Sequence, residues 1–330
     1  MANPAVSSTK STSLRTGAAG RTHSGSVVVP VGQVREFVDL QIERALEHDE
    51  LELLLASIVA LMRRRRGKEA ESLKAYVFEQ MLERLDEPPS RRRIWPWVRL
   101  CAARPEVEAR QLACVLLSAY WKDHRKDVER LTLNLARDED AEVRQYAAST
   151  MSRIVRANFR LRLRYLQAWS RHPDPSVRRQ VIIATVGVAD PDRPERAKHL
   201  LNLLEPHLKD RDPYVRRNLG PFALGQGLLR AYPEATLVRF KQWLKEDDEV
   251  LRWNLAIALA AADIEQWEAA LEILKILAAD SRRFVWGAAS AALSTLTGRQ
   301  GDEVRTHLRR WMRDPQLRVA VTSALRTNPR

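Results

Sequence analysis

The chain has 330 residues and a formal net charge of +13, with 55 Lys and Arg against 42 Asp and Glu. This excess favours an acidic partner, such as nucleic acid or an acidic protein surface. The longest apolar run, residues 51–62, contains a glutamate and is too short to cross a bilayer, so no membrane partner is expected. The two cysteines allow neither a disulfide framework nor a metal-ligand spacing, and no phosphate-binding glycine loop is present. We therefore expect no metal, no cofactor and a reducing, cytoplasmic location.

Residues 1–28 are rich in Ser, Thr, Gly and Ala and contain no acidic residue. This composition cannot bury enough apolar surface to fold, so we interpret the segment as a disordered basic arm, although a transit peptide is similar in composition. From about residue 32, apolar residues recur at intervals of three and four, which predicts helices. We expect one all-α domain over residues 29–330, with weaker helical pairs over 32–104 and clear repeats from about 105.

A short pattern recurs along the chain: an acidic residue, two variable residues, an apolar residue and a basic residue. It reads DAEVRQ from residue 140, DPSVRR from 174, DPYVRR from 212, DEVLRW from 248 and DPQLRV from 314, and more loosely EVEARQ from 106 and SRRFVW from 281. The steps between successive starts are 34, 34, 38, 36, 33 and 33 residues. A period of this length is typical of helical pairs stacked into one continuous solenoid.

The start of each pattern predicts a helix N-terminus. In DPYVRR, Asp212 can accept hydrogen bonds from the free N–H groups of the first turn, and Pro213 suits the first helical position. Val215 then falls on the core face. The pattern resembles a HEAT repeat, in which the second helix opens with Asp and carries Val-Arg. This resemblance implies a right-handed α-α superhelix, an armadillo-type curved solenoid.

The HEAT resemblance also implies a ladder of Asp and Arg side chains between neighbouring repeats. The candidates, which we interpret as structural, are Asp140, Asp174, Asp212, Asp248 and Asp314 with Arg144, Arg178, Arg216, Arg252 and Arg318. The ladder is expected to break at the pattern from 281, where Ser281 occupies the cap position and Val285 the arginine position.

The residue after the motif arginine points away from the core, toward the inner surface that the second helices line. Four successive repeats place there Arg179, Arg217, Trp253 and Trp286. Arginines could bind phosphates and indoles could stack on bases, the alternative being that the tryptophans belong to the core. A second arginine-rich stretch, residues 153–171, adds Arg160 and Arg164 as candidate phosphate contacts, the alternative being a solvated face.

A more specific resemblance covers roughly residues 170–260. Its segment from 204 to 259, with Tyr-Val-Arg-Arg, Pro-Glu, Trp-Leu and Arg-Trp in that order, is similar to the HEAT-like bacterial DNA alkylation repair glycosylases. That family holds DNA in a basic concave cleft and excises cationic alkylated bases, chemistry that requires a carboxylate near the developing positive charge. In the family, acids project from inner helices at and after Val-Arg-Arg. The corresponding positions of this chain are Ile182, Ile183, Ala184 and Gly225.

We therefore expect a non-enzymatic, monomeric HEAT-repeat binding module with no catalytic residue. Its basic concave face would bind an acidic partner, foremost nucleic-acid backbone, with DNA favoured. Two alternatives stay open: a protein–protein interaction scaffold for an acidic protein, and a DNA alkylation repair glycosylase.

Pro221 is expected to disturb the helix that begins at Pro213. It has no N–H for the carbonyl of Arg217, and its ring crowds that turn, so the sequence predicts a kinked α-helix on the concave side. The kink is interpreted either as an adaptation to the neighbouring repeat or as a notch that a ligand approaches closely.

Overall fold

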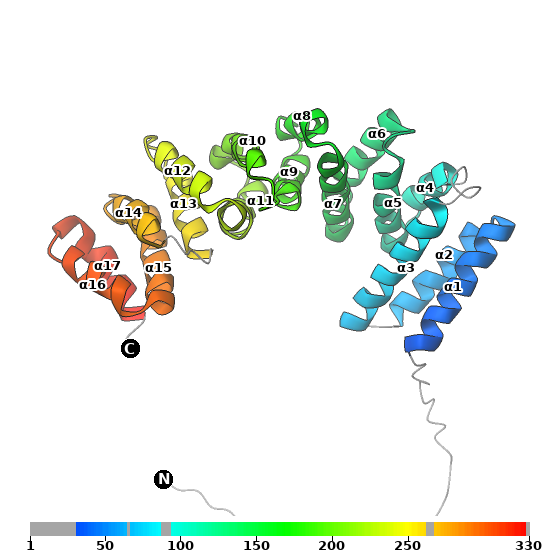
Figure 1. Cartoon of the computed structure of the whole chain (residues 1–330), viewed down its shortest axis with the longest axis horizontal. Coiled ribbons are helices and arrows are strands. Elements are labelled where there is room, and N and C mark those ends of the chain that lie inside the picture. Colours follow the sequence, from blue (N-terminus) through cyan, green and yellow to red (C-terminus); the bar gives the residue numbers. More distant parts are fainter. Residues whose placement is uncertain (1–30, 65–66, 87–93, 262–266, 328–330) are drawn as a thin grey trace, which may run out of the picture.

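The computed structural model describes residues 31–64, 67–86, 94–261 and 267–327, which form an arch of stacked helices (Figure 1). The described residues contain seventeen α-helices and no strand, which confirms the predicted all-α class. The expected basic arm, residues 1–28, lies outside the described residues.

The helices alternate between two layers after an irregular start. Four helices precede the regular repeats: α1 Val31–His48, α2 Leu51–Arg63, α3 Lys68–Asp86 and α4 Ile94–Ala103. The inner helices are α5 Val107–Tyr120, α7 Ala141–Ala157, α9 Pro175–Val188, α11 Pro213–Arg216, α13 Glu249–Ala261, α15 Arg283–Gln300 and α17 Pro315–Thr327. The outer helices are α6 Arg125–Leu135, α8 Phe159–Ser170, α10 Ala197–Leu204, α12 Pro233–Trp243, α14 Trp267–Ala278 and α16 Asp302–Trp311. A π-helix, Leu219–Leu229, follows α11.

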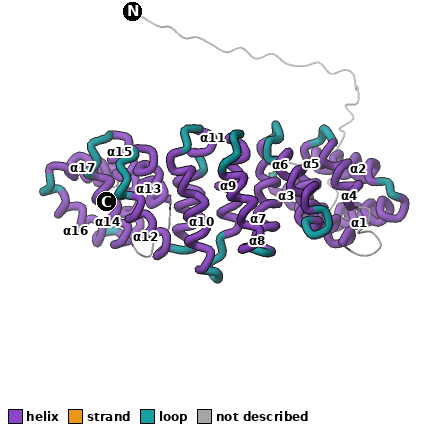
Figure 2. Tube along the Cα trace, turned by 90° about the horizontal axis from the view of Figure 1, so that it is seen from above, coloured by secondary structure: helices purple, strands orange, loops and turns teal. Residues whose placement is uncertain are grey.

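The inner layer is continuous along the arch, and the outer layer is continuous from α8 to α14. Inner helices pack on the inner helices of the next repeat, as α5 does on α7, α7 on α9 and α13 on α15. The outer helices α8, α10, α12 and α14 pack in succession above them. In Figure 1, α6, α8, α10 and α12 follow the convex side of the arch, and α7, α9, α13 and α15 lie on its concave side. Figure 2 shows the same row from above, one repeat beside the next. This layering is that of a helical solenoid.

The recurring pattern fixes where each inner helix begins and which face it buries. One side-chain oxygen accepts a first-turn backbone N–H at 2.8–2.9 Å in each of Asp140, Asp174, Asp212, Asp248 and Asp314. Three positions later the apolar residue is at most 1% exposed in each of Val143, Val177, Val215, Leu251 and Leu317. Such a cap contributes about 1 kcal/mol, and burial of one aliphatic side chain contributes about 1.5–3 kcal/mol.

The sequence predicted a kinked α-helix around Pro221, and this prediction is wrong. The segment is α-helical only over Pro213–Arg216 and becomes π-helical over Leu219–Leu229. The N–H of Ala223 donates to the carbonyl of Asn218, five residues earlier, at 3.0 Å. This wider hydrogen-bond pattern accommodates a proline that the α-helical pattern would exclude.

Two glycines allow the π-helix to approach its neighbours closely. A Cβ atom on Gly220 would lie 2.4 Å from Ile257 Cγ1 of α13, and one on Gly227 would lie 2.8 Å from Val186 Cγ2 of α9. Neither distance is compatible with a side chain, so the absence of a Cβ sets how tightly these inner helices pack.

Candidate nucleic-acid interface

The motif arginine makes the same backbone contact in five repeats. Its guanidinium donates to the carbonyl oxygen of the residue six positions earlier, just before the inner helix. These bonds, at 2.6–3.4 Å, join Arg110 to Arg104, Arg144 to Asp138, Arg178 to His172, Arg252 to Glu246 and Arg318 to Met312. The arginine therefore fastens the turn between the outer and inner helices, whatever else it binds.

Three of these arginines also bind a carboxylate of the next repeat. The pairs are Arg110–Asp138 at 2.8 Å, Arg178–Asp210 at 2.7 Å and Arg252–Asp280 at 2.7 Å. Each carboxylate lies two residues before the N-cap of its repeat, which corrects the predicted ladder: the N-cap aspartates bind backbone N–H groups instead. At the repeat where the sequence predicted a break, Asp280 still receives Arg252 of the preceding repeat, but Trp286 stands in the position of the motif arginine, so this repeat supplies no arginine to the next one. Among the described residues, Arg216 forms no ion pair.

Arg144 fastens its turn but has no carboxylate partner among the described residues. Its Nη1 donates to the carbonyl oxygens of Asp138 and Glu139 at 2.6 and 2.8 Å. Its Nε donates to the hydroxyl oxygen of Tyr214 at 3.0 Å. Because Tyr214 belongs to α11, the Arg144 side chain on α7 extends past α9 to the second repeat along the arch.

Arg179 contacts the same tyrosine. Its guanidinium carbon lies 4.7 Å from the centroid of the Tyr214 ring, and that of Arg144 lies 5.6 Å away. Its Nε donates to Asn218 Oδ1 at 3.0 Å. Burial lowers the pKa of Arg179, Tyr214 acts in the opposite direction, and the nearby charges of Arg144 and Arg217 lower that pKa further. We call Arg144, Arg179 and Arg217 the arginine cluster.

The arginine cluster is an uncompensated positive site. Guanidinium groups stay protonated in proteins, and none of the three pairs with a carboxylate of the described residues. Arg217 is exposed, and the other two are partly buried. The three side chains come from α7, α9 and the end of α11, which are successive helices of the inner layer. Positive charge is therefore concentrated on the concave side of the central repeats.

A second regular contact joins neighbouring inner helices. The fifth residue after one cap meets the second residue after the next cap, in the pairs Gln111–Glu142, Arg179–Tyr214 and Trp253–Phe284. The rings of Trp253 and Phe284 stack with centroids 5.0 Å apart and planes 12° apart, and Phe284 is 49% exposed. The contacts thus change along the arch from an acidic pair to a basic pair and then to an aromatic pair.

The structure corrects the position of Trp286 in the repeat. The N-cap of α15 is Arg282, not Ser281, so Val285 is the buried core residue. Trp286 then occupies the place of the motif arginine. The residue equivalent to Arg179 and Trp253, one position later, is Gly287. Trp286 is partly buried and packs against the core.

Arg160 and Arg164 are not brought together with Arg179 and Arg217. Both lie on α8, on the convex side of the arch (Figure 1). They are exposed, and Arg164 lies over the ring of Tyr165 at 5.2 Å from its centroid. The six predicted binding residues therefore fall into three groups: two convex arginines, two concave arginines and the two tryptophans. Sequence reasoning missed Arg144 as a member of the concave group, because it was assigned to the ladder.

The positions where the resembling glycosylases carry acids belong to the core of this chain. Ile182 and Ala184 are fully buried, Ile183 is 6% exposed, and Gly225 lies in a buried part of the π-helix. Neither α9 nor the π-helix contains Asp or Glu. The inner surface beside the arginine cluster therefore receives no carboxylate from these two helices.

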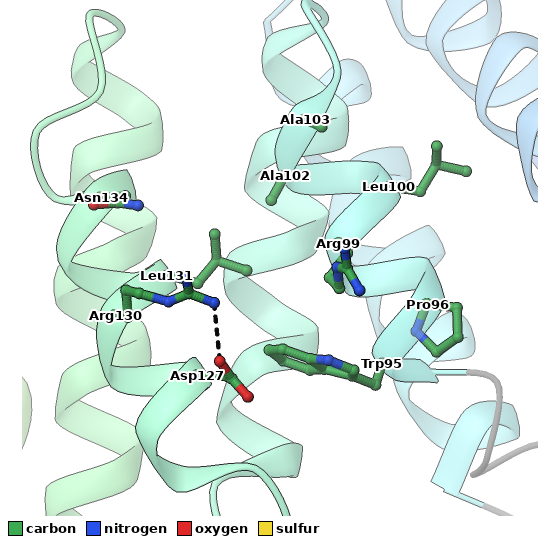
Figure 3. A pocket seen from close by; sticks show the side chains of 10 residues that line it. All are labelled: Trp95, Pro96, Arg99, Leu100, Ala102, Ala103, Asp127, Arg130, Leu131 and Asn134. Carbon is green, nitrogen blue, oxygen red and sulfur yellow. Dashed lines mark hydrogen bonds and ion pairs between the residues drawn. The ribbon is translucent and has the colours of Figure 1, made fainter.

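The structure also contains a pocket that the sequence did not indicate. It lies between α4 and α6 and has a volume of about 660 Å³ (Figure 3). Trp95 lines it and stacks on His124 with ring centroids 4.9 Å apart, while Arg130 pairs with Asp127 at 2.9 Å on its other side. This pocket is separate from the arginine cluster. No group of His, Cys, Asp or Glu in the described chain is arranged to hold a metal ion.

Comparison with known proteins bears on the central repeats. Residues 75–223 match the family model of the DNA alkylation repair enzymes. This match confirms the resemblance. It includes all three residues of the arginine cluster. An engineered protein solved by crystallography aligns over 89% of this chain and 84% of its own, with 16% identity and a TM-score of 0.32. No curated protein matches the chain, and no helix among the described residues is long and apolar enough to span a membrane.

Proposed function

We propose that the concave face of the central repeats binds the phosphate backbone of nucleic acid, with DNA preferred, and that the chain acts there as a non-enzymatic, monomeric binding module of the cytoplasm. The observation that carries this proposal is the arginine cluster: three guanidinium groups from successive inner helices without a carboxylate partner among the described residues. A formal charge of +13 over the whole chain adds a long-range attraction for a polyanion.

The geometry of the cluster suits phosphate binding. A guanidinium group can donate two parallel hydrogen bonds to phosphate oxygens. Tyr214 contacts the guanidinium groups of both Arg144 and Arg179 and would order both before a ligand arrives. Ordering long side chains in advance reduces the conformational entropy that binding would otherwise cost.

Our proposal that the chain is not an enzyme rests on α9 and the π-helix. Cleavage of an N-glycosidic bond requires stabilisation of positive charge on the sugar, which a nearby carboxylate supplies. The inner helix α9 and the π-helix carry apolar residues where the resembling enzymes carry acids. The family match keeps a DNA alkylation repair glycosylase as the second candidate, and release of a cationic alkylated purine from duplex DNA by the purified chain would establish it.

A salt titration of duplex binding tests the proposal. Replacing Arg144, Arg179 and Arg217 together by Gln should lower the slope of log K against log salt by roughly 0.9 for each phosphate contact, about 2.7 in all. The matched control replaces three exposed arginines at the convex side, Arg160, Arg164 and Arg171, and so removes the same charge. Equal slopes for the two triple variants, or a parent that does not bind duplex, would contradict the proposal. Binding of an acidic protein in place of nucleic acid would instead support the scaffold alternative.

A further inference from the structure

The ladder position that corresponds to Arg144 is occupied by a histidine. Arg110 and Arg252 each bind an aspartate 28 residues further along the chain, Asp138 and Asp280. The residue 28 positions after Arg144 is His172. The third ladder pair spans 32 residues, across the longest repeat.

His172 performs one of the two tasks of a ladder aspartate. Its Nδ1 accepts the backbone N–H of Asp174 at 3.1 Å. Asp138 accepts the N–H of Asp140 in the same way at 2.9 Å, and Asp210 accepts that of Asp212 at 3.0 Å. The turn before α9 is thus stabilised as in the repeats of Asp138, Asp210 and Asp280.

The second task, binding the arginine of the preceding repeat, is one that His172 cannot perform. A carboxylate accepts two guanidinium hydrogen bonds side by side, as Asp138 does from Arg110 at 2.8 and 3.0 Å. The imidazole has one acceptor nitrogen, and the Asp174 N–H occupies it. Arg144 therefore has no anionic partner at this junction, and its Nε binds Tyr214 instead.

We infer that His172 is a positioning residue that keeps Arg144 in the arginine cluster, because it stabilises the turn before α9 without supplying the carboxylate that binds the motif arginine in three other repeats. This inference rests on the proposed function for its consequence, the availability of Arg144 to phosphate. The direct structural part, competition between residue 172 and Tyr214 for Arg144, does not depend on any ligand.

The binding test compares two substitutions at one position. His172→Asp should hold Arg144 in a ladder pair, lower the affinity for a 20-base-pair duplex about fivefold, or roughly 1 kcal/mol, and lower the salt slope by about 0.9. His172→Asn keeps an oxygen for the Asp174 N–H without a charge, so its affinity should stay within about twofold of the parent. In an Arg144→Gln background, His172→Asp should cause no further loss. An equal loss in both backgrounds would mean that the new charge acts without Arg144, which would overturn the inference.

A stability cycle separates this inference from the proposed function. His172→Asp should raise the denaturant midpoint when Arg144 is present and should not raise it in the Arg144→Gln background. If the parent does not bind duplex, the proposed function is wrong, but this cycle still tests the competition for Arg144. Absence of coupling between residues 144 and 172 would show that Arg144 is not redirected by His172.

Discussion

The junction between α5 and α7 and the junction between α7 and α9 have the same backbone frame and different charge. At the first, Arg110 binds Asp138, and Glu142 accepts a hydrogen bond from Gln111 and pairs with Lys74. Each positive group there has an acidic neighbour. At the second, Arg144 binds only carbonyl oxygens and a phenol. Five repeats share the bond from the motif arginine to the carbonyl six residues earlier, and only three of them add a carboxylate partner.

This comparison explains how a solenoid can acquire a ligand site without altering its fold. The junction between α5 and α7, which we call the balanced junction, buries its charges, since the side chains of Arg110 and Asp138 are 9% and 11% exposed. The junction between α7 and α9, which we call the open junction, leaves Arg144 and Arg179 facing a neighbouring repeat and the concave side. At the ladder position itself, the two arrangements differ by one residue type, Asp138 in the first and His172 in the second.

The largest expected effect is the loss of stability at the balanced junction. Asp138→Asn keeps an oxygen for the N–H of Asp140 but leaves the Arg110 guanidinium buried without an anion. The free energy of unfolding should fall by about 3–5 kcal/mol, as measured by urea denaturation. His172→Asn at the open junction is the matched control and should change stability by less than about 1 kcal/mol. Similar costs at both junctions would remove the distinction between them.

An intermediate effect is expected at acidic pH. Burial tends to raise the pKa of Asp210, but the hydrogen bonds from His207 and Arg178 hold it well below its usual range. A lowered folded-state pKa adds stability above the unfolded pKa of about 3.9, and that stability is lost as the pH falls through the folded value. As the pH falls below ~4, the free energy of unfolding should therefore decrease less steeply for Asp210→Asn than for the parent. Parallel pH profiles would assign acid sensitivity to other groups.

The smallest expected effect concerns duplex binding and distinguishes Arg144, which we expect to contact phosphate, from Arg110, which we do not. Arg144→Gln should weaken duplex binding about fivefold, close to 1 kcal/mol, with a reduced salt slope. Arg110→Gln should lower the melting temperature but leave the salt slope of the folded fraction unchanged, because its charge is already paired. The two variants are compared by measuring duplex binding well below the melting temperature of each. A reduced slope for Arg110→Gln would mean that its junction also contacts phosphate.

Local sequence signals predicted the parts of the fold that depend on local interactions. Asp212 accepts a first-turn N–H and Val215 is buried because both properties follow from residues within four positions of each other. The ladder partners could not be found in this way. Asp138 and Asp210 read as loop residues in the sequence, and only the stacking of repeats brings them against an arginine about thirty positions away.

The candidate site was partly predicted, and its errors have physical causes. Arg179 and Arg217 were placed correctly on the inner layer because each lies five residues after an aspartate that caps its helix. Trp286 was displaced by one position because its helix lacks an aspartate cap, and Arg282 takes that place. Arg144 was missed because its hydrogen-bond partner, Tyr214, lies two repeats away, which no periodicity in the sequence indicates. Whether the tryptophans bind a ligand stays a prediction.

The π-helix has a consequence for how this chain is aligned with relatives. The step from Asp212 to Asp248 is 36 residues, two longer than the step from Asp140 to Asp174. Wider helical turns hold extra residues inside a continuous helix, so the added length need not appear as a longer loop. The match to the family model ends at residue 223, inside this helix. An alignment gap belongs within the helix itself, and inner-facing residues beyond Leu219 should be assigned by structural superposition instead of by counting from the cap.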